Sequence, residues 1–140
     1  MTSRITPYLG YEDGDAAIEF LVKAFGFTEQ FKMHMPDGRV GHAELDLDGS
    51  GIMLGCPPDY KSPRREGRPS DVLVHVYVDD VDAHHAQAKA AGATILEEPA
   101  DQVYGDRRYT AEDLEGHRWM FAKHVRDAGN WWETTEEQQS

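Results

Sequence analysis

The chain has 140 residues, which is the size of a single domain, and 39% of them are hydrophobic, enough for a buried core. Its formal net charge of −12 excludes nucleic acid and anionic membrane surfaces as expected partners, because both are polyanions. No apolar run approaches the roughly 20 residues that span a bilayer, no signal peptide opens the chain, and the single cysteine, Cys56, cannot form an internal disulfide, so we expect a cytoplasmic protein.

The first 55 residues predict a strand, a helix and three further strands. Apolar residues recur at helical spacing in a segment that begins after Asp13 or Asp15 and ends at Gly26, a residue type common after helix ends. Alternating patterns predict strands at Ile5–Tyr11, at Thr28–Met35 and in a hairpin over Val40–Gly55.

This hairpin has two chemically different faces. Asp48-Gly49 predicts a type I′ turn, because both central residues of that turn need a positive φ. With this turn, Glu44 lies opposite Met53, and directly opposed residues share a face of the sheet. The apolar face carries Leu45, Leu47, Ile52 and Leu54. The other face carries His42, Glu44 and Met53, a composition that suits contact with a ligand or with water.

A linker over residues 56–71, with four prolines and three arginines and no periodicity, separates this unit from a second one. The second unit, residues 72–124, predicts strands at Val72–Val78, Thr94–Glu98, Arg107–Glu112 and His117–His124, and a helix over Val81–Ala91. Residues 125–140 form an acidic tail, in which one of the adjacent Trp131 and Trp132 is expected to dock on the body or on a partner subunit. The chain is therefore one domain, with a first unit over residues 5–55.

The two units are an internal repeat. Asp82 follows Asp15, and Met120 follows Met53, by the same 67 positions. A repeated βαβββ unit whose helix covers an apolar strand face predicts an α+β fold. We expect two tandem βαβββ units that form a curved mixed sheet around a cavity, with the helices on its outer face.

Six stretches, of which one is Phe25–Phe27, resemble the vicinal oxygen chelate superfamily, which includes glyoxalase I, extradiol dioxygenases and the bleomycin- and fosfomycin-resistance proteins. The others are Thr6–Leu9, Ala16–Leu21, Gly41–Leu45, His75–Ala83 and Asp113–Trp119. Within the superfamily the sequence is most similar to the glyoxalase-like branch that includes PhnB-type proteins. The resemblance extends over residues 5–124 and implies the same fold, whereas one fold hosts many activities.

The resemblance also bears on metal binding. Metal enzymes of this superfamily hold a divalent ion with histidine and glutamate from the first and fourth strands of each unit. The matching positions in this chain are Thr6, Met53, Leu73 and Met120. None of them offers the imidazole nitrogen or carboxylate oxygen that zinc, nickel or iron require. The resemblance thus implies no metal and no cofactor at the usual site and argues against glyoxalase I activity, unless a register shift substitutes His75 for Leu73.

Alternation along the strands assigns eight side chains to the cavity as candidate ligand contacts. They are Tyr8, His42, Glu44, Met53, His75, Tyr77, Arg118 and Met120. Methionine and aromatic walls suit flat apolar molecules, and Arg118 would either clamp an anionic group or pair with Glu44.

His42 and Glu44 are the candidate catalytic pair. Because they stand at positions i and i+2 of one strand, they point to the same side, and the carboxylate could orient the histidine as a general base. They could equally supply two ligands of a displaced metal site with His75, or form a hydrogen-bonded pair on a half-solvated sheet.

The sequence favours a cytoplasmic, metal-free protein of the bleomycin-resistance type that binds a small, partly aromatic molecule. Members of the family are commonly homodimers, and the long linker would permit exchange of strands between subunits. The alternative is a lyase or isomerase that uses His42 and Glu44 or a metal held by non-standard residues. A structural module whose cavity binds nothing is a third interpretation.

Overall fold

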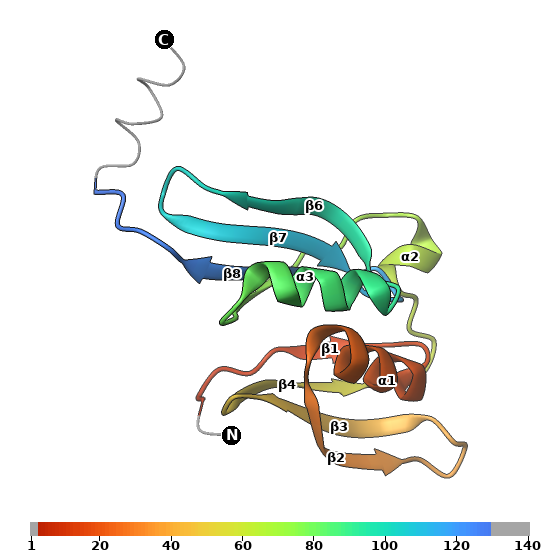
Figure 1. The fold of residues 1–140 in the computed structure, drawn as a ribbon. Coiled ribbons are helices and arrows are strands. Elements are labelled where there is room, and N and C mark those ends of the chain that lie inside the picture. Colours follow the sequence, from red (N-terminus) through yellow and green to blue (C-terminus); the bar gives the residue numbers. More distant parts are fainter. Residues whose placement is uncertain (1–2, 130–140) are drawn as a thin grey trace.

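The computed structural model describes residues 3–129, and Figure 1 shows their helices and strands in chain order. The strands are β1 (Tyr8–Gly10), β2 (Thr28–His34), β3 (Val40–Leu47), β4 (Ser50–Gly55), β5 (Leu73–Tyr77), β6 (Thr94–Asp101), β7 (Asp106–Glu112) and β8 (Arg118–His124). The helices are α1 (Gly14–Phe25), α2 (Pro63–Glu66) and α3 (Val81–Ala90). Every predicted element is present, β1 is shorter than predicted, and α2 is a short helix within the linker.

The strands form two four-stranded mixed sheets. Sheet A has the order β1-β4-β3-β2, and sheet B has the order β5-β8-β7-β6. In each sheet the first strand runs parallel to the last strand of its unit, and the other neighbours are antiparallel. Tyr8 pairs with Met53 in sheet A, and His75 pairs with Met120 in sheet B. The 67-residue repeat of the sequence is therefore also a repeat of strand register.

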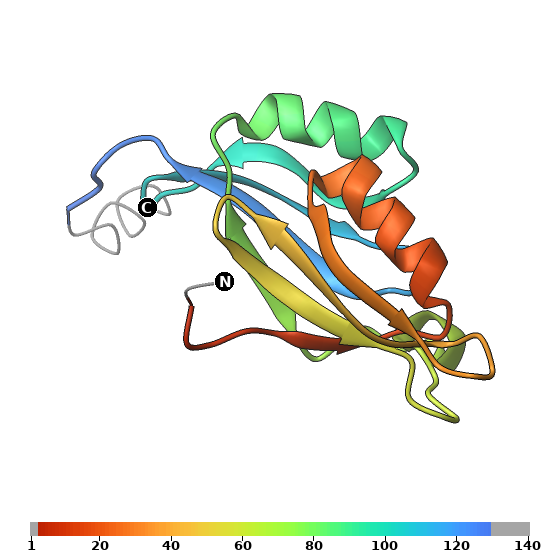
Figure 2. The same ribbon diagram turned by 90° about the horizontal axis from the view of Figure 1, so that it is seen from below.

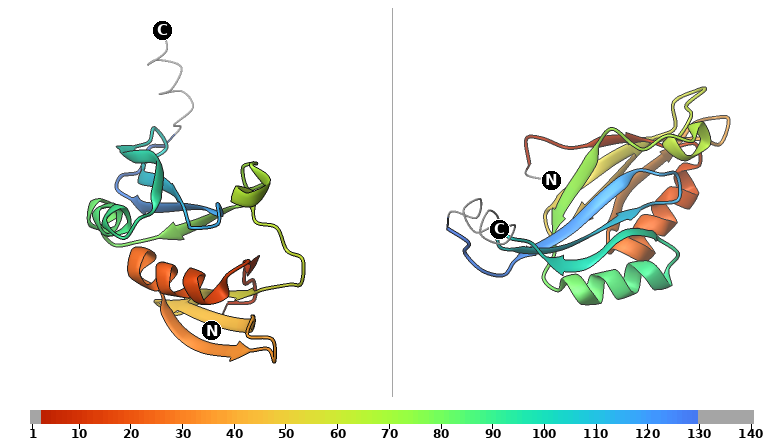
Figure 3. Two further views of the ribbon diagram at one scale, coloured as in Figure 1. Left: turned by 90° about the vertical axis from the view of Figure 1, so that its right-hand side faces the viewer. Right: turned by 90° about the horizontal axis from the view of Figure 1, so that it is seen from above.

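The predicted α+β class and the two βαβββ units are confirmed, but one chain forms two sheets rather than one continuous curved sheet. Helices α1 and α3 lie between the sheets (Figures 1 and 3). They run side by side (Figure 2), and the side chains of Gln87 and His84 on α3 bond to the carbonyls of Lys23 and Phe25 on α1. The two sheets are not joined to each other, so β1 is an edge strand of sheet A and β5 is an edge strand of sheet B.

Both long helices begin at equivalent caps. The side chain of Asp13 accepts a hydrogen bond from the backbone of Ala16, and the side chain of Asp80, 67 positions later, accepts one from Ala83. These carboxylates satisfy free N–H groups at the positive ends of the helices. Gly26 ends α1 with a φ of 85°, a left-handed conformation that favours glycine.

The predicted hairpin register is confirmed. Asp48 and Gly49 have φ values of 50° and 89°, as a type I′ turn requires. Glu44 pairs with Met53 and Leu45 pairs with Ile52. The apolar face of the hairpin is thereby directed at the helix layer, and the face with His42 and Glu44 is directed away from it.

An aromatic cluster joins the two units at the centre of the molecule. Phe25, at the end of α1, contacts Trp119 and Phe121 of sheet B, with ring centroids 5.4 and 4.7 Å apart. Phe27 also contacts Trp119. All four side chains are buried. Burial of such large rings is the main favourable term for holding the units together.

A buried polar network also joins the units and fixes the end of β1. Asp113, 2% exposed, accepts hydrogen bonds from the Tyr11 hydroxyl at 2.7 Å and from the Trp119 indole at 3.1 Å. The Nε2 atom of His117 lies 2.6 Å from the carbonyl oxygen of Gly10. Glu115 accepts from the backbone N–H groups ahead of α1, and burial raises the pKa of its carboxyl. These bonds hold the strand that carries Tyr8 against the second unit.

Of the acidic tail predicted over residues 125–140, the structure describes only residues 125–129. The expectation that Trp131 or Trp132 docks on the body or on a partner lies outside them, since the description ends at residue 129. Within residues 3–129, no helix has the length and apolar character needed to cross a membrane.

Candidate functional site

The eight predicted ligand contacts lie on the outer faces of the two sheets, where the outer face of a sheet is the one turned away from the helices. Sheet A carries Tyr8, His42, Glu44 and Met53, and sheet B carries His75, Tyr77, Arg118 and Met120. With the helix layer between the sheets, these outer faces point away from each other (Figure 3). One chain therefore brings together two groups of four residues rather than one group of eight.

On sheet A, three polar side chains form a continuous chain of contacts. The Tyr8 hydroxyl lies 3.0 Å from Nδ1 of His42, and Nε2 of the same imidazole lies 3.0 Å from a carboxylate oxygen of Glu44. The histidine and glutamate side chains are 27% and 35% exposed, so the pair is half-buried and still accessible. The predicted proximity of His42 and Glu44 is thus present, and Tyr8 extends it onto a second strand.

Apolar side chains surround this polar chain. Met53 lies opposite Glu44 and beside Tyr8 in the strand pairing. Phe31 and Met33 of β2 pair with Glu44 and His42, and their side chains are 47% and 45% exposed. These two residues were not predicted as ligand contacts, although alternation along Thr28–Met35 combined with the hairpin register places them on this face. On the outer face of sheet A, accessible apolar side chains thus surround the Tyr8–His42–Glu44 contacts.

On sheet B the predicted residues have different surroundings. The rings of His75 and Tyr77 meet edge to face with centroids 4.8 Å apart. Nε of Arg118 lies 3.4 Å from a carboxylate oxygen of Glu112 rather than pairing with Glu44. Met120 is nearly buried within the sheet.

Three further polar residues of sheet B lie beside Met120 and were not predicted. Arg108 donates a hydrogen bond to the Met120 sulfur at 3.2 Å, and Thr110 donates one to Glu97 at 2.9 Å. Arg108 and Thr110 occupy the positions in β7 that His42 and Glu44 occupy in β3, because Thr110 pairs with Met120 as Glu44 pairs with Met53. The outer face of sheet B is therefore richer in hydrogen-bond donors than that of sheet A.

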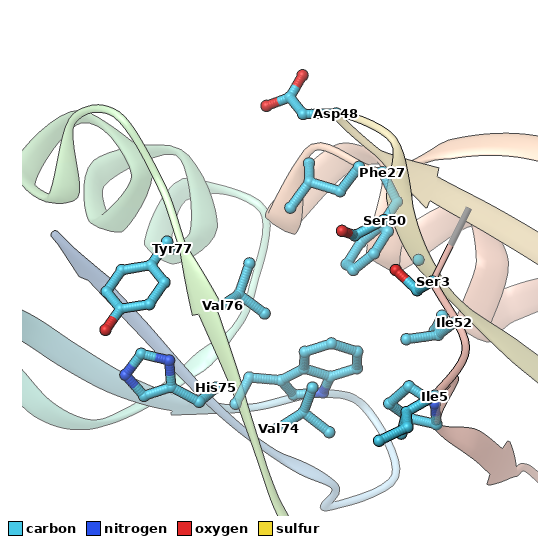
Figure 4. A pocket seen from close by; sticks show the side chains of 14 residues that line it. Ser3, Ile5, Phe27, Asp48, Ser50, Ile52, Val74, His75, Val76 and Tyr77 are labelled. Atoms are coloured by element: carbon cyan, nitrogen blue, oxygen red, sulfur yellow. The ribbon is translucent and has the colours of Figure 1, made fainter. Parts of the chain in front are cut away.

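A cleft of about 410 Å³ lies between the edges of the two sheets (Figure 4). Its walls are mainly apolar and include Ile5, Phe27, Ile52, Val74, Val76 and Trp119. Figure 4 shows Val74 and Val76 directed toward Ile52 and Phe27, whereas His75 and Tyr77 lie on the other side of β5. The cleft thus adjoins the outer face of sheet B at β5 but is distinct from the His42 contacts.

The residues at the metal-binding positions of the resembled family are not suited to hold a divalent metal ion. Thr6, Met53, Leu73 and Met120 offer a hydroxyl, two thioethers and an alkyl chain, which are poor ligands for divalent zinc, nickel or iron. Over residues 3–129, no three histidine, cysteine, aspartate or glutamate side chains are grouped closely enough to hold a metal. His42 and His75 lie on different sheets, so the displaced site suggested for them is not formed within one chain.

Comparison with known proteins gives consistent matches. Residues 4–121 match the family model described as "Glyoxalase/Bleomycin resistance protein/Dioxygenase superfamily". The uncharacterized protein Rv0887c of Mycobacterium tuberculosis is 36% identical over 129 residues, which cover 88% of this chain and 75% of the relative.

Solved structures with the same fold include two proteins of different sequence similarity. TioX from Micromonospora sp. ML1 is 33% identical, with a TM-score of 0.71 over 88% of this chain and 99% of that one. The fosfomycin resistance protein FosX from Listeria monocytogenes, described in complex with Mn(II) and a sulfate ion, has a TM-score of 0.66 over 96% of this chain and 98% of that one. At 16% identity, FosX is similar in fold alone.

Proposed function

Because the chain belongs to the Glyoxalase/Bleomycin resistance protein/Dioxygenase superfamily, we propose that it binds a small, partly aromatic molecule against the outer faces of its sheets. The observation that carries this proposal is the composition of sheet A. Two methionines and two aromatic rings are accessible there around a single polar centre, which is the character of a site for a flat organic molecule. A solvated sheet face with no ligand would be expected to carry mostly charged residues.

We further propose that the complete site lies between two copies of the chain. Strands β1 and β5 are edge strands, and the inter-sheet cleft is lined by β5 and by the segment just before β1. Apolar side chains beside these edges are strongly exposed, including Ile5 at 87% and Tyr77 at 66%. If β1 of one copy lies beside β5 of the other, the edges and these side chains are covered, and sheet A of one copy faces sheet B of its partner. The curved sheet predicted for one chain would then be formed by two.

Metal-free binding follows from the donor chemistry at the family's metal positions. We expect elemental analysis of the purified protein to find no stoichiometric nickel, zinc or iron. Stoichiometric metal that is lost in a His42→Ala variant would contradict this part of the proposal. The cytoplasmic location and the lack of nucleic-acid or membrane partners stay predictions based on the charge of −12 and the single cysteine.

The binding proposal is tested by a thermal-shift screen with planar aromatic compounds and aromatic antibiotics, followed by calorimetry of the compounds that stabilise the protein. Tyr8→Ala and Tyr77→Ala should each lower affinity about ten-fold or more, because each removes a ring from one face. Leu114→Ala is the matched control, since Leu114 is also an exposed apolar side chain but lies in the turn between β7 and β8. Equal loss in all three variants would contradict a site on the outer faces.

Mixing the two tyrosine variants tests the shared site. Light scattering should give a mass twice that of the 15.8 kDa chain. If each site takes sheet A from one copy and sheet B from the other, a Tyr8→Ala and Tyr77→Ala mixed dimer has one intact site. Random exchange would then restore about a quarter of the native binding capacity, because half of the dimers are mixed. No restoration from a mixture whose subunits exchange would contradict the shared site.

One observation favours a second candidate function, a lyase or isomerase. The contact between Glu44 and His42 has the arrangement of an oriented general base. In that case any compound that the screen identifies should be converted to product, and His42→Ala should abolish turnover while leaving binding within about three-fold. Recovery of every bound compound unchanged would favour simple binding.

A further inference from the structure

We infer that sheet A selects ligands that donate a hydrogen bond, because Tyr8 presents its oxygen lone pairs, and not its hydrogen, to the ligand. This inference rests on the proposed function, since it names the chemistry of the molecule bound there. It makes Glu44 a positioning residue that acts through His42 on Tyr8.

The direction of the hydrogen bonds is set by the carboxylate. An ionised Glu44 can only accept, so Nε2 of His42, 3.0 Å away, must carry the hydrogen. In a neutral imidazole the other nitrogen, Nδ1, is then an acceptor. The Tyr8 hydroxyl, 3.0 Å from Nδ1, has a single hydrogen and must donate it there. Only the lone pairs of the phenol oxygen are left for a ligand.

The surrounding backbone seats the phenol in this position. A side-chain carbon at Gly55 would lie 3.0 Å from the Tyr8 oxygen and 2.9 Å from the carbonyl oxygen of Gly41. The absence of a side chain at Gly55 therefore leaves the space that the phenol occupies beside β4. The Phe31 ring lies 6.1 Å from the imidazole on its other flank. Tyr8 and His42 are thus placed by neighbours as well as by the hydrogen bond between them.

The opposite sheet complements this preference. The equivalent positions on sheet B offer Arg108, which can only donate, and Thr110, while Arg118 lies on the same face opposite Glu112. In the dimer proposed above, a ligand would meet acceptors on sheet A and donors on sheet B. The structure thus points to a planar aromatic molecule with a hydroxyl or N–H group on one edge and a carbonyl or anionic group on the other.

The first test needs no ligand. Long-range ¹H–¹⁵N correlation spectra of the labelled protein at pH 7.5 report which imidazole nitrogen carries the hydrogen, and the His42 signals are assigned by their loss in His42→Ala. We expect the Nε2–H form in the native protein and a shift toward Nδ1–H in Glu44→Leu, in which the acceptor is removed. The Nδ1–H form in the native protein would overturn the inference, even if ligands bind as proposed.

The second test uses 2-naphthol and 2-methoxynaphthalene, which share a ring system but differ in whether they can donate a hydrogen bond. We expect native protein to bind 2-naphthol about three- to ten-fold more tightly, the difference that one net hydrogen bond makes. Tyr8→Phe should abolish this preference while retaining 2-methoxynaphthalene binding. Equal affinity of native protein for both compounds, or an unchanged preference in Tyr8→Phe, would overturn the inference. Failure of both compounds to bind would overturn the proposed function and the ligand preference together, whereas the tautomer result would stand.

Discussion

The two repeat units have the same backbone and different chemistry. Their first and last strands pair in the same register 67 positions apart, and their helices start at equivalent aspartate caps. Yet the positions held by His42 and Glu44 in sheet A are held by Arg108 and Thr110 in sheet B. Caps, turns and apolar faces determine the backbone, whereas the outer faces carry no part of the core. Those faces are therefore free to differ, and a histidine with a carboxylate on sheet A is replaced by an arginine with a threonine on sheet B.

The helices differ as much as the faces do. Helix α1 buries seven residues, whereas α3 buries only Val81 and Ala88. The first unit therefore supplies the helix side of the core, and the second unit packs against it through its sheet.

This asymmetry predicts the largest effect of any substitution considered. Phe25→Ala should lower the free energy of unfolding by about 3–5 kcal/mol, because it empties a fully buried site among Trp119 and Phe121. Val81→Ala, in the first turn of α3, should cost only about 1–2 kcal/mol. Urea unfolding of both variants measures the comparison. Equal losses would mean that the two helices contribute equally.

Two aspartates near the hairpin turns of the two units give the next largest contrast. Asp113 is buried and accepts from Tyr11, Trp119 and two backbone N–H groups, whereas Asp46, at the end of β3, accepts one hydrogen bond, from the backbone of Gly49. Asp113→Asn should cost about 2–4 kcal/mol, because an amide turns a donor toward groups that also donate. Asp46→Asn should cost less than about 0.5 kcal/mol. Chemical denaturation of the pair would contradict this account if the order were reversed.

The sequence was sufficient to predict most of the fold. The Asp48-Gly49 turn set the hairpin register, helical spacing located α1, and the constant offset between Met53 and Met120 revealed the repeat. Each of these signals is local or periodic, so it does not depend on how the two units pack. The fold class and the order of elements followed from them.

The arrangement of the site could not be predicted in the same way. Nothing in the local pattern states whether the two sheets of one chain meet at an edge or are separated by the helices, because both arrangements bury the same apolar faces. The decision depends on contacts such as Phe25 with Trp119, between residues far apart in the sequence. For the same reason, the eight residues predicted to share one cavity lie on two sheets, on the faces turned away from the helices.

His84 and His124 have no histidine at the equivalent positions of the first unit. We expect them to affect stability by smaller amounts and with opposite dependences on pH. His84 packs between α1 and Tyr109, and burial lowers the pKa of its imidazole below 6.5. The unfolded chain then binds the proton more readily than the folded protein does. The contribution of neutral His84 to the free energy of unfolding is therefore full above about pH 6.5 and is lost on acidification. The carboxylates of Asp127 and Asp106 raise the pKa of exposed His124, so its contribution is present below pH 6.5 and is lost as pH rises.

Unfolding free energies between pH 5.5 and 7.5 test this opposition. His84→Gln should lose less stability on acidification than the native protein, and His124→Gln should lose more. Parallel pH profiles for the native protein and both variants would contradict the assigned directions.

Only a small effect on stability is expected at the residue of greatest functional interest. His42→Ala removes two half-exposed hydrogen bonds on an outer face and no core contact, so it should change the free energy of unfolding by less than about 0.5–1 kcal/mol. Thermal unfolding together with binding of an aromatic compound from the screen measures both properties in one variant. Loss of binding with native stability would separate the outer face of sheet A from the core beneath it. A loss of stability similar to that of Asp113→Asn would instead show that the Tyr8–His42–Glu44 contacts hold sheet A together, and the difference between the two outer faces would then be structural in origin.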